Sequence, residues 1–179
     1  MDPSSSFRKC VLIEMKAPSE PTVFYSTTTN SAEETRALAA RLARVLPVPV
    51  ALLLVGPLGS GKTVFAQGLA RGLGIEEQIT SPSFLLMKEY QGTRHLRHLD
   101  LFRLKRQGEV HPLGLTEDLP PDAVVVVEWA DRFPLNLRLP ALIVQIAVGD
   151  SMNERRLGFS ASGLAQEEVM KIDHALRTA

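Results

Sequence analysis

Residues 50–63 read VALLLVGPLGSGKT, and this stretch decides the fold. Its apolar first half is short and continuous and stops at a glycine, which is typical of a strand buried on both faces in a parallel sheet. Its second half fits the pattern G-x-x-x-x-G-K-[ST], which joins a strand to a helix. We therefore expect a helix over 62–73, ended by Gly72 and Gly74.

The loop at 56–63 predicts a phosphate-binding site. Its glycines allow tight turns that aim N–H groups inward, and with the next helix N-terminus they form a concave anion site. Lys62 is expected to reach the β- and γ-phosphates of a nucleotide, and the Thr63 hydroxyl to bind Mg²⁺. A glycine-rich turn with an accidental lysine is disfavoured, because the motif is complete and both flanks agree. The residues expected to contact the nucleotide here are Gly56, Pro57, Leu58, Gly59, Ser60, Gly61, Lys62, Thr63 and Val64.

Helices and strands alternate along the rest of the chain. Ser31 and Glu34 have the spacing of a capping box, and the helix that they begin is amphipathic until Pro47 ends it. This alternation predicts an α/β fold, a three-layer sandwich of the P-loop NTPase type with a central, mostly parallel sheet. Further strands are expected at 84–90, 96–101, 123–128, 141–148 and 155–160, and a last helix at 164–176.

Composition limits the functions that are open. The chain has 179 residues, with 45% hydrophobic and 22% charged, which is typical of a globular protein. Lys+Arg and Asp+Glu are both 20, which excludes nucleic-acid binding through bulk charge. The single cysteine, Cys10, allows no intrachain disulfide and favours a cytoplasmic location.

The domain organisation is expected to be simple. Residues 1–22 are rich in serine and proline without clear periodicity, so we interpret them as a loose leader and 23–179 as a single domain. The longest apolar runs are far shorter than the roughly 18 residues that a membrane helix needs, so no membrane partner is expected.

Two acidic residues are candidates for the chemistry. Glu128 ends the buried run at 124–127, where a second strand would deliver a carboxylate beside the phosphates for Mg²⁺ binding. Asp100 shares a strand face with His98 and Phe102, and it is a candidate to orient the attacking water or complete the outer shell of the metal. An ordinary acid at a strand end stays open as the alternative for both. Zinc binding by His98 and Asp100 is set aside, because a third ligand at a suitable spacing is missing.

Weaker signals surround these acids. Hydroxyls from Thr80 onward are candidates to sense the γ-phosphate, although the residues alone favour a polar turn shaped by Pro82. Trp129 is a candidate to stack on a base or a partner, or else packs in the core. A local basic cluster is interpreted as a solvated edge in preference to an RNA contact. Its members are Arg94, Arg97, Arg103, Lys105 and Arg106.

Together these residues resemble the TsaE family, the small ATPase of bacterial tRNA threonylcarbamoyladenosine biosynthesis, over about residues 29–160. Five short motifs occur in the order and spacing of that family, and their coincidence is far more specific than any one of them. The matching stretches are GPLGSGKT at 56–63, TSPSF at 80–84, HLDLFR at 98–103, a looser VHPLGL at 110–115 and VEW at 127–129.

The resemblance implies an activity and its participants. The family hydrolyses ATP slowly and works with TsaD and TsaB, the threonylcarbamoyl transferase core, with tRNA reached through that complex. By this resemblance Thr63 and Glu128 hold Mg²⁺, while Asp100 supports hydrolysis together with Lys62 and Glu128. The nucleotide site extends to Thr80, Trp129, Arg132 and Ser31.

The chain departs from the family pattern at several positions. Pro57 replaces an aspartate, Phe102 replaces a tyrosine, and the acidic, leucine-rich element is eroded at 107–112. None of these changes falls on the residues assigned to catalysis or Mg²⁺ binding. No N-K-x-D motif follows the loop, so the guanine-reading element of common GTPases is missing.

Three other functions stay open from the residues alone. A small-molecule kinase of the same architecture would need an acceptor pocket, and the lack of an arginine-rich lid segment weakens this alternative. A nucleotide-gated interaction module would bind a partner in response to ATP without turnover. A tRNA-binding protein would use the basic cluster and show a steep salt dependence.

Overall fold

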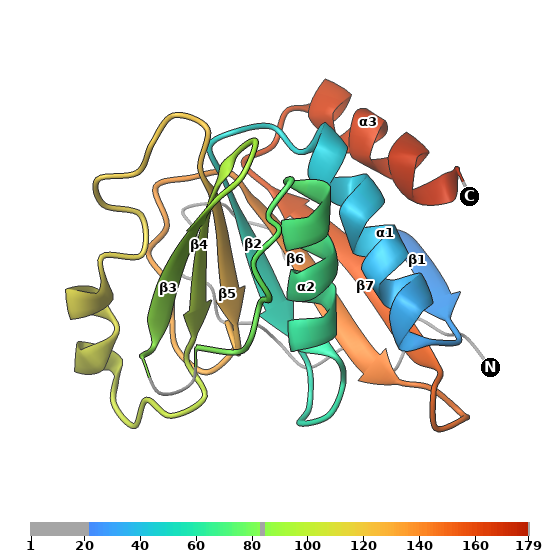
Figure 1. Cartoon of the computed structure of the whole chain (residues 1–179), viewed down its shortest axis with the longest axis horizontal. Coiled ribbons are helices and arrows are strands. Elements are labelled where there is room, and N and C mark those ends of the chain that lie inside the picture. Colours follow the sequence, from blue (N-terminus) through green and yellow to red (C-terminus); the bar gives the residue numbers. More distant parts are fainter. Residues whose placement is uncertain (1–21, 83–84, 179) are drawn as a thin grey trace.

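The computed structural model describes residues 22–82 and 85–178. Its centre is a seven-stranded sheet of order β1-β7-β6-β2-β5-β4-β3 (Figure 1). The strands are β1 (Val23–Thr29), β2 (Val50–Val55), β3 (Met87–Gln91), β4 (His95–Asp100), β5 (Val124–Glu128), β6 (Ala141–Val148) and β7 (Arg155–Ser162). The helices are α1 (Ala32–Val45), α2 (Lys62–Gly72), α3 (Gln166–Arg177) and the 3₁₀-helices η2 (Gln107–Glu109) and η3 (His111–Leu113).

The middle of the sheet is parallel and its edges are antiparallel. Strand β2 pairs in parallel with β5 and β6, and β5 pairs in parallel with β4. Strands β3, β7 and β1 are antiparallel to their neighbours. Every residue of β2 and β5 is buried, as the continuous apolar runs predicted. The predicted α/β fold with a mostly parallel central sheet is confirmed.

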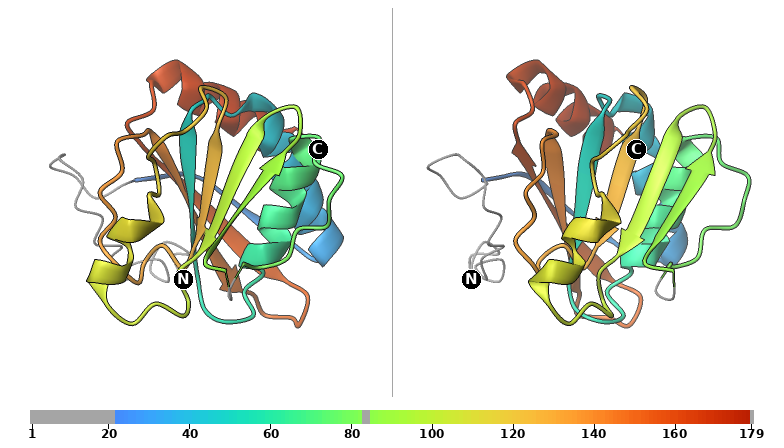
Figure 2. Two further views of the ribbon diagram at one scale, coloured as in Figure 1. Left: turned by 60° about the vertical axis from the view of Figure 1, so that its left-hand side comes forward. Right: turned by 90° about the vertical axis from the view of Figure 1, so that its left-hand side faces the viewer.

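The two faces of the sheet are covered differently. Residues of α1, α2 and α3 pack with one face into one apolar core cluster. On the other face, the second cluster includes residues from the segments between β4 and β5 and between β5 and β6. Figure 2 shows α1 and α2 on one side of the sheet and the yellow segment with η2 and η3 on the other. The third layer is therefore largely irregular chain in the described residues.

Helices α1 and α2 pack very closely because α2 carries glycines on the shared face. A Cβ atom at Gly68 would lie 2.3 Å from the Arg36 carbonyl oxygen, and one at Gly72 would lie 2.4 Å from that of Ala40. Gly72 is also the last residue of α2, where the sequence predicted the helix end. This packing fixes the axis of α2, whose N-terminus carries the phosphate-binding loop.

Three differences from the sequence predictions concern strands. Strand β1 was not predicted, since VFYSTTT has no continuous apolar run and pairs only with β7. The strand predicted over 84–90 begins later, at Met87, because the amides of Leu85 and Leu86 bond back to the Pro82 carbonyl in a turn and Leu86 has a φ of 63°. Strand β7 extends two residues beyond the predicted end, to Ser162.

Some predictions concern residues that the structure does not describe. The leader predicted for residues 1–22 lies almost wholly outside the described residues, as do Ser83 and Phe84 of the predicted strand and motif. None of the helices in the described part of the chain is long and apolar enough to cross a membrane.

Candidate functional site

The loop at 56–61 leaves the carboxyl end of β2 and turns into α2 at the lower end of the sheet in Figure 1. Gly59 and Gly61 have φ values of 76° and 100°, in the left-handed region that favours glycine. A Cβ atom at Gly56 would lie only 2.1 Å from the Ile146 carbonyl oxygen of β6. The glycines of the motif are therefore required by backbone conformation and by close approach to the neighbouring strand.

Lys62 lies folded over this loop and is almost completely buried. Its Nζ donates to the carbonyl oxygens of Gly56, at 2.7 Å, and Pro57, at 2.9 Å. The same ammonium lies 3.5 Å from the centroid of the Trp129 ring, which gives a cation–π contact. Burial lowers the pKa of Lys62, and the nearby carboxylates of Glu128, Asp131 and Asp100 oppose that shift.

Glu128, at the end of β5, joins the loop to β4. The Thr63 hydroxyl donates to Oε2 of Glu128 at 2.9 Å, and Nε2 of His98 lies 2.9 Å from Oε1. An ionised carboxylate only accepts, so His98 donates its Nε2–H to Glu128. His98 is completely buried and Glu128 is 2% exposed. Both oxygens of Glu128 are thus held in place at the N-terminus of α2.

This donor set fits Mg²⁺. The Thr63 hydroxyl and the Glu128 carboxylate are hard oxygen ligands, and Mg²⁺ is commonly held by one or two protein oxygens together with phosphates and water. Among the described residues, no group of three or more His, Cys, Asp and Glu side chains is arranged to hold a metal by itself. The site therefore suits an ion that arrives with a phosphate ligand.

Asp100, at the end of β4, lies beside Glu128 in the register of the parallel pair. Its Oδ1 accepts from the Phe102 amide at 2.9 Å, and its Oδ2 accepts a short hydrogen bond from the Ser81 hydroxyl. Asp100 is 2% exposed, yet it lines the same cleft as Glu128. The structure thus brings both predicted acids to one edge of the sheet.

These residues surround a cleft of about 470 Å³. Most of the predicted site residues line it, and three residues that were not assigned to the site, Ser81, Phe102 and Arg103, line it as well. Ser81, the neighbour of the predicted Thr80, is the hydroxyl that meets Asp100, whereas Thr80 is exposed and is not among the lining residues. The lining residues are Leu58, Gly59, Gly61, Lys62, Thr63, Val64, Ser81, Asp100, Phe102, Arg103, Glu128 and Trp129.

Two residues predicted for the nucleotide site, Trp129 and Arg132, both lie beside the Phe102 ring. Trp129 has a φ of 61°, an uncommon conformation for a large side chain, and its ring lies 4.7 Å from that of Phe102. The guanidinium of Arg132 lies 5.7 Å from the Phe102 ring and donates to the Leu104 carbonyl at 2.9 Å. Trp129 therefore forms part of the cleft wall, whereas Arg132 contacts Phe102 and Leu104 and is not among the lining residues.

Two other sequence hypotheses have structural roles. Ser31 caps α1 by accepting from the Glu34 amide at 3.1 Å, and the Glu34 side chain accepts from the Asn30 amide at 2.7 Å, as a capping box predicts. The basic cluster does not gather on one surface. Arg94 donates to the Leu46 carbonyl, and Arg97 is buried against Glu89 and the carbonyls of a neighbouring loop. These two arginines are therefore used within the fold.

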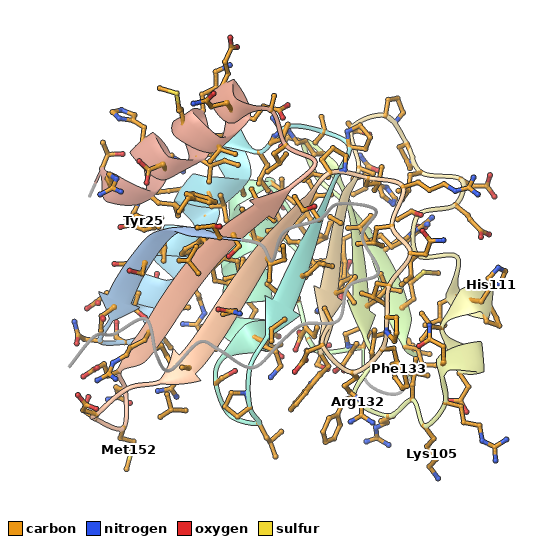
Figure 3. All side chains as sticks on the ribbon, turned by 180° about the vertical axis from the view of Figure 1, so that it is seen from behind. Tyr25, Lys105, His111, Arg132, Phe133 and Met152 are labelled. Atoms are coloured by element: carbon orange, nitrogen blue, oxygen red, sulfur yellow. The ribbon has the colours of Figure 1, made fainter. Side chains whose placement is uncertain are left out.

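The rim of the cleft lies at one edge of the molecule. Figure 3 shows Lys105, Arg132 and Phe133 along the lower edge and Met152 on the other side of the same edge. Leu58 and Met152 are 76% and 88% exposed, respectively. This edge of the molecule thus carries both cationic and apolar side chains.

A buried central strand, a glycine-rich loop at its carboxyl end and acids on adjacent parallel strands define the P-loop class of α/β proteins. The comparisons narrow this class to a family. The model for the family described as "Threonylcarbamoyl adenosine biosynthesis protein TsaE" matches residues 29–157. The chain belongs to the TsaE family, which takes part in tRNA threonylcarbamoyladenosine biosynthesis.

Individual relatives agree with this assignment. The chain is 39% identical to the tRNA threonylcarbamoyladenosine biosynthesis protein TsaE of Bacillus subtilis (strain 168) over 139 residues, 75% of this chain and 84% of that protein. It is 37% identical to the TsaE protein of Treponema pallidum (strain Nichols) over 119 residues, 66% and 87% of the two chains. The crystal structure of Bacillus subtilis YdiB is similar, with a TM-score of 0.65 and 30% identity, covering 88% of this chain and 98% of that one.

Proposed function

We propose that this chain binds ATP with Mg²⁺ and hydrolyses it slowly, in support of the threonylcarbamoyl transferase complex of TsaD and TsaB. The observation that carries the proposal is the hydrogen bond between Thr63 and Glu128 at the mouth of the loop. It places a hydroxyl and a carboxylate side by side at a helix N-terminus, where a phosphate chain and its metal ion would be held. The single cysteine of the chain favours a cytoplasmic location for this activity.

The chain's own residues have separate tasks in this proposal. The amides of the loop and the N-terminus of α2 hold the phosphates, and Lys62 turns from the Gly56 and Pro57 carbonyls toward their oxygens. Mg²⁺ bound at this site would neutralise charge that develops on the phosphoryl oxygens. Thr63 and Glu128 would hold the ion, and His98 keeps the Glu128 carboxylate in a fixed orientation.

Asp100 is proposed to orient the attacking water. Its two oxygens already accept from Ser81 and from the Phe102 amide, and these bonds fix the orientation of the carboxylate at the cleft. A carboxylate held in one orientation can accept a hydrogen bond from the attacking water and so position it. This supports a slow basal turnover that depends on positioning and electrostatics.

The experiment is phosphate release from ATP by the purified chain, alone and with TsaD, TsaB and tRNA. We expect slow release that rises when TsaD and TsaB are added and disappears in Glu128→Gln. The matched control is Glu77→Gln, an acid that is 61% exposed and pairs with Lys88 away from the cleft. A rate of phosphate release that does not change when TsaD and TsaB are added would contradict the proposed partners. Full activity of Glu128→Gln would contradict the proposed role of Glu128 in the site.

The same experiment separates the other candidate functions. Phosphate release without any acceptor would argue against a small-molecule kinase. A nucleotide-gated module without turnover predicts ATP-dependent binding to a partner that survives Asp100→Ala. The proposal predicts instead that hydrolysis is lost in Asp100→Ala while ATP is still bound.

A further inference from the structure

Arg155, the first residue of β7, joins the phosphate-binding loop to the turn between β6 and β7. Its Nε donates to the Ser60 carbonyl oxygen at 2.9 Å, and its Nη2 donates to that of Gly59 at 3.2 Å. Its Nη1 donates to the carbonyls of Met152 and Glu154, both at 2.8 Å. One guanidinium therefore engages four backbone carbonyls from two segments of the chain.

The loop carbonyls matter because each is rigidly coupled to an amide. A peptide unit is planar and trans, so the Ser60 carbonyl and the Gly61 N–H point in opposite directions. A carbonyl held by a donor on the outside of the loop therefore turns the next N–H toward the inside. Glycines allow many peptide orientations, and Gly61 has a φ of 100°, so the loop sequence alone does not select one orientation.

The structure shows the same coupling one residue earlier. The Gly59 carbonyl accepts from Arg155, and the amide of the same peptide unit, that of Ser60, donates to the Pro57 carbonyl at 3.2 Å. This unit is therefore fixed at both ends. The unit that follows is fixed at its carbonyl end by the 2.9 Å bond to Nε, so its Gly61 amide points away from Arg155.

We propose that Arg155 is a positioning residue for nucleotide binding, which acts by holding the Gly61 amide toward the β-phosphate. The inference rests on the proposed function, since it assumes that the loop binds ATP. Arg155 also places a positive charge beside the loop, which strengthens the attraction for phosphate. Because it touches the loop from the outside, it affects affinity for the phosphate chain more than the chemical step.

The neighbouring arginine offers a matched control. Arg156 lies next in β7, and its guanidinium pairs with Asp150 and Glu154, both in the β6–β7 turn. Substitution of Arg156 therefore perturbs the same turn without removing a donor to the Gly59 or Ser60 carbonyl. A comparison of the two positions separates an effect on the loop from a general loosening of the turn.

The test measures Kd for ATP and ADP with Mg²⁺, together with kcat at saturating ATP. Trp129 is the only tryptophan and contacts Lys62, so its fluorescence reports binding. We expect Arg155→Met to weaken both nucleotides by about tenfold, because the loop keeps its direct phosphate contacts but loses the donor that orients it, with kcat within about twofold. Arg155→Lys, which keeps the charge but lacks the planar fork, should recover only part of the affinity. Arg156→Met should match the wild type.

Each contrary outcome points to a different error. Wild-type affinity in Arg155→Met, or equal losses in Arg155→Met and Arg156→Met, would overturn the role of Arg155. Full recovery by Arg155→Lys would show that charge alone suffices and would overturn positioning through the fork. If Arg155→Met fails to fold, Arg155→Lys decides the question by the same criterion. If the wild type binds neither nucleotide, the proposed function fails instead.

Discussion

The carboxyl ends of β4 and β5 offer the same chemical group in two different settings. Asp100 and Glu128 pair in register on adjacent parallel strands, and each is 2% exposed. Glu128 is held by Thr63 of α2 and by the buried His98, so it belongs to the phosphate-binding loop. Asp100 is held by Ser81 and the Phe102 amide, on the segments that leave α2 and β4.

We infer separate roles for the two acids from their hydrogen-bond partners, since their positions in the sheet are equivalent. A carboxylate beside the Thr63 hydroxyl at a helix N-terminus suits a metal ion. A carboxylate fixed by a serine and a backbone amide, facing the same cleft, suits a water molecule that approaches the phosphates. The predictions that follow test whether the two acids have these separate roles, from the largest expected effect to the smallest.

The largest effect is expected for Glu128→Gln. The amide keeps the size of the side chain but removes the charge that would hold Mg²⁺, so hydrolysis should fall by about 10²–10³-fold. The measurement is phosphate release at saturating ATP and Mg²⁺. A fall smaller than about threefold would show that Glu128 is not the metal-binding acid.

A smaller and different effect is expected for Asp100→Asn. The substitution should lower kcat by about 10- to 100-fold, because the water loses an oriented acceptor. The Kd for ATP with Mg²⁺ should stay within about twofold, since the metal-binding pair is intact. If Asp100→Asn weakens ATP binding as much as Glu128→Gln does, the two acids do not have separate roles.

Substitutions of Thr63 test whether Mg²⁺ is held by the pair of Thr63 and Glu128. Thr63→Val keeps the shape but removes the hydroxyl that donates to Glu128, so the Mg²⁺ concentration for half-maximal hydrolysis should rise by about tenfold. Thr63→Ser keeps the hydroxyl and is the matched control. An unchanged Mg²⁺ requirement in Thr63→Val would remove Thr63 from the metal site.

The smallest effect concerns the free energy of unfolding and involves Lys62, which interacts electrostatically with both acids. Burial lowers the pKa of Lys62 in the folded state, with partial opposition from Glu128 and Asp100. At pH values below this lowered pKa, the unfolded chain holds the proton more readily than the folded chain, which costs stability. That cost is relieved as the pH rises from the lowered pKa toward 10.5.

Lys62→Met tests this sign. It removes the titration, so the stability of the wild type relative to Lys62→Met should increase between pH 7 and pH 10 (the range that urea unfolding can cover). Lys171→Met, at an exposed position of α3, is the control. A stability difference that is constant or moves in the opposite direction would contradict the burial of a charged Lys62.

The parts of the fold and site that were predictable have local signatures. The buried runs at β2 and β5, the loop glycines and the capping box at Ser31 each follow from a few adjacent residues. Strand β1 was missed because its sequence has no apolar run and is stabilised by pairing with β7, far along the chain.

The partners of the site residues are long-range and have no such signature. Arg155 lies 95 residues from Ser60, and His98 lies 30 residues from Glu128. The choice between Thr80 and Ser81 depends on which of two adjacent hydroxyls faces Asp100, and Asp100 lies 19 residues from Ser81 in the sequence. Arg97 was interpreted as part of a solvated edge, but it is buried and donates to the Gly114 carbonyl. This contact joins residues 17 positions apart, so it has no local signature in the sequence.

The most direct test of the separate roles of the two acids is calorimetric titration of ATP, with and without Mg²⁺, into the wild type, Glu128→Gln and Asp100→Asn. The account predicts that Mg²⁺ strengthens ATP binding to the wild type and to Asp100→Asn by the same factor, and that this gain disappears in Glu128→Gln. An equal Mg²⁺ gain in both variants, or its loss in Asp100→Asn alone, would contradict the account.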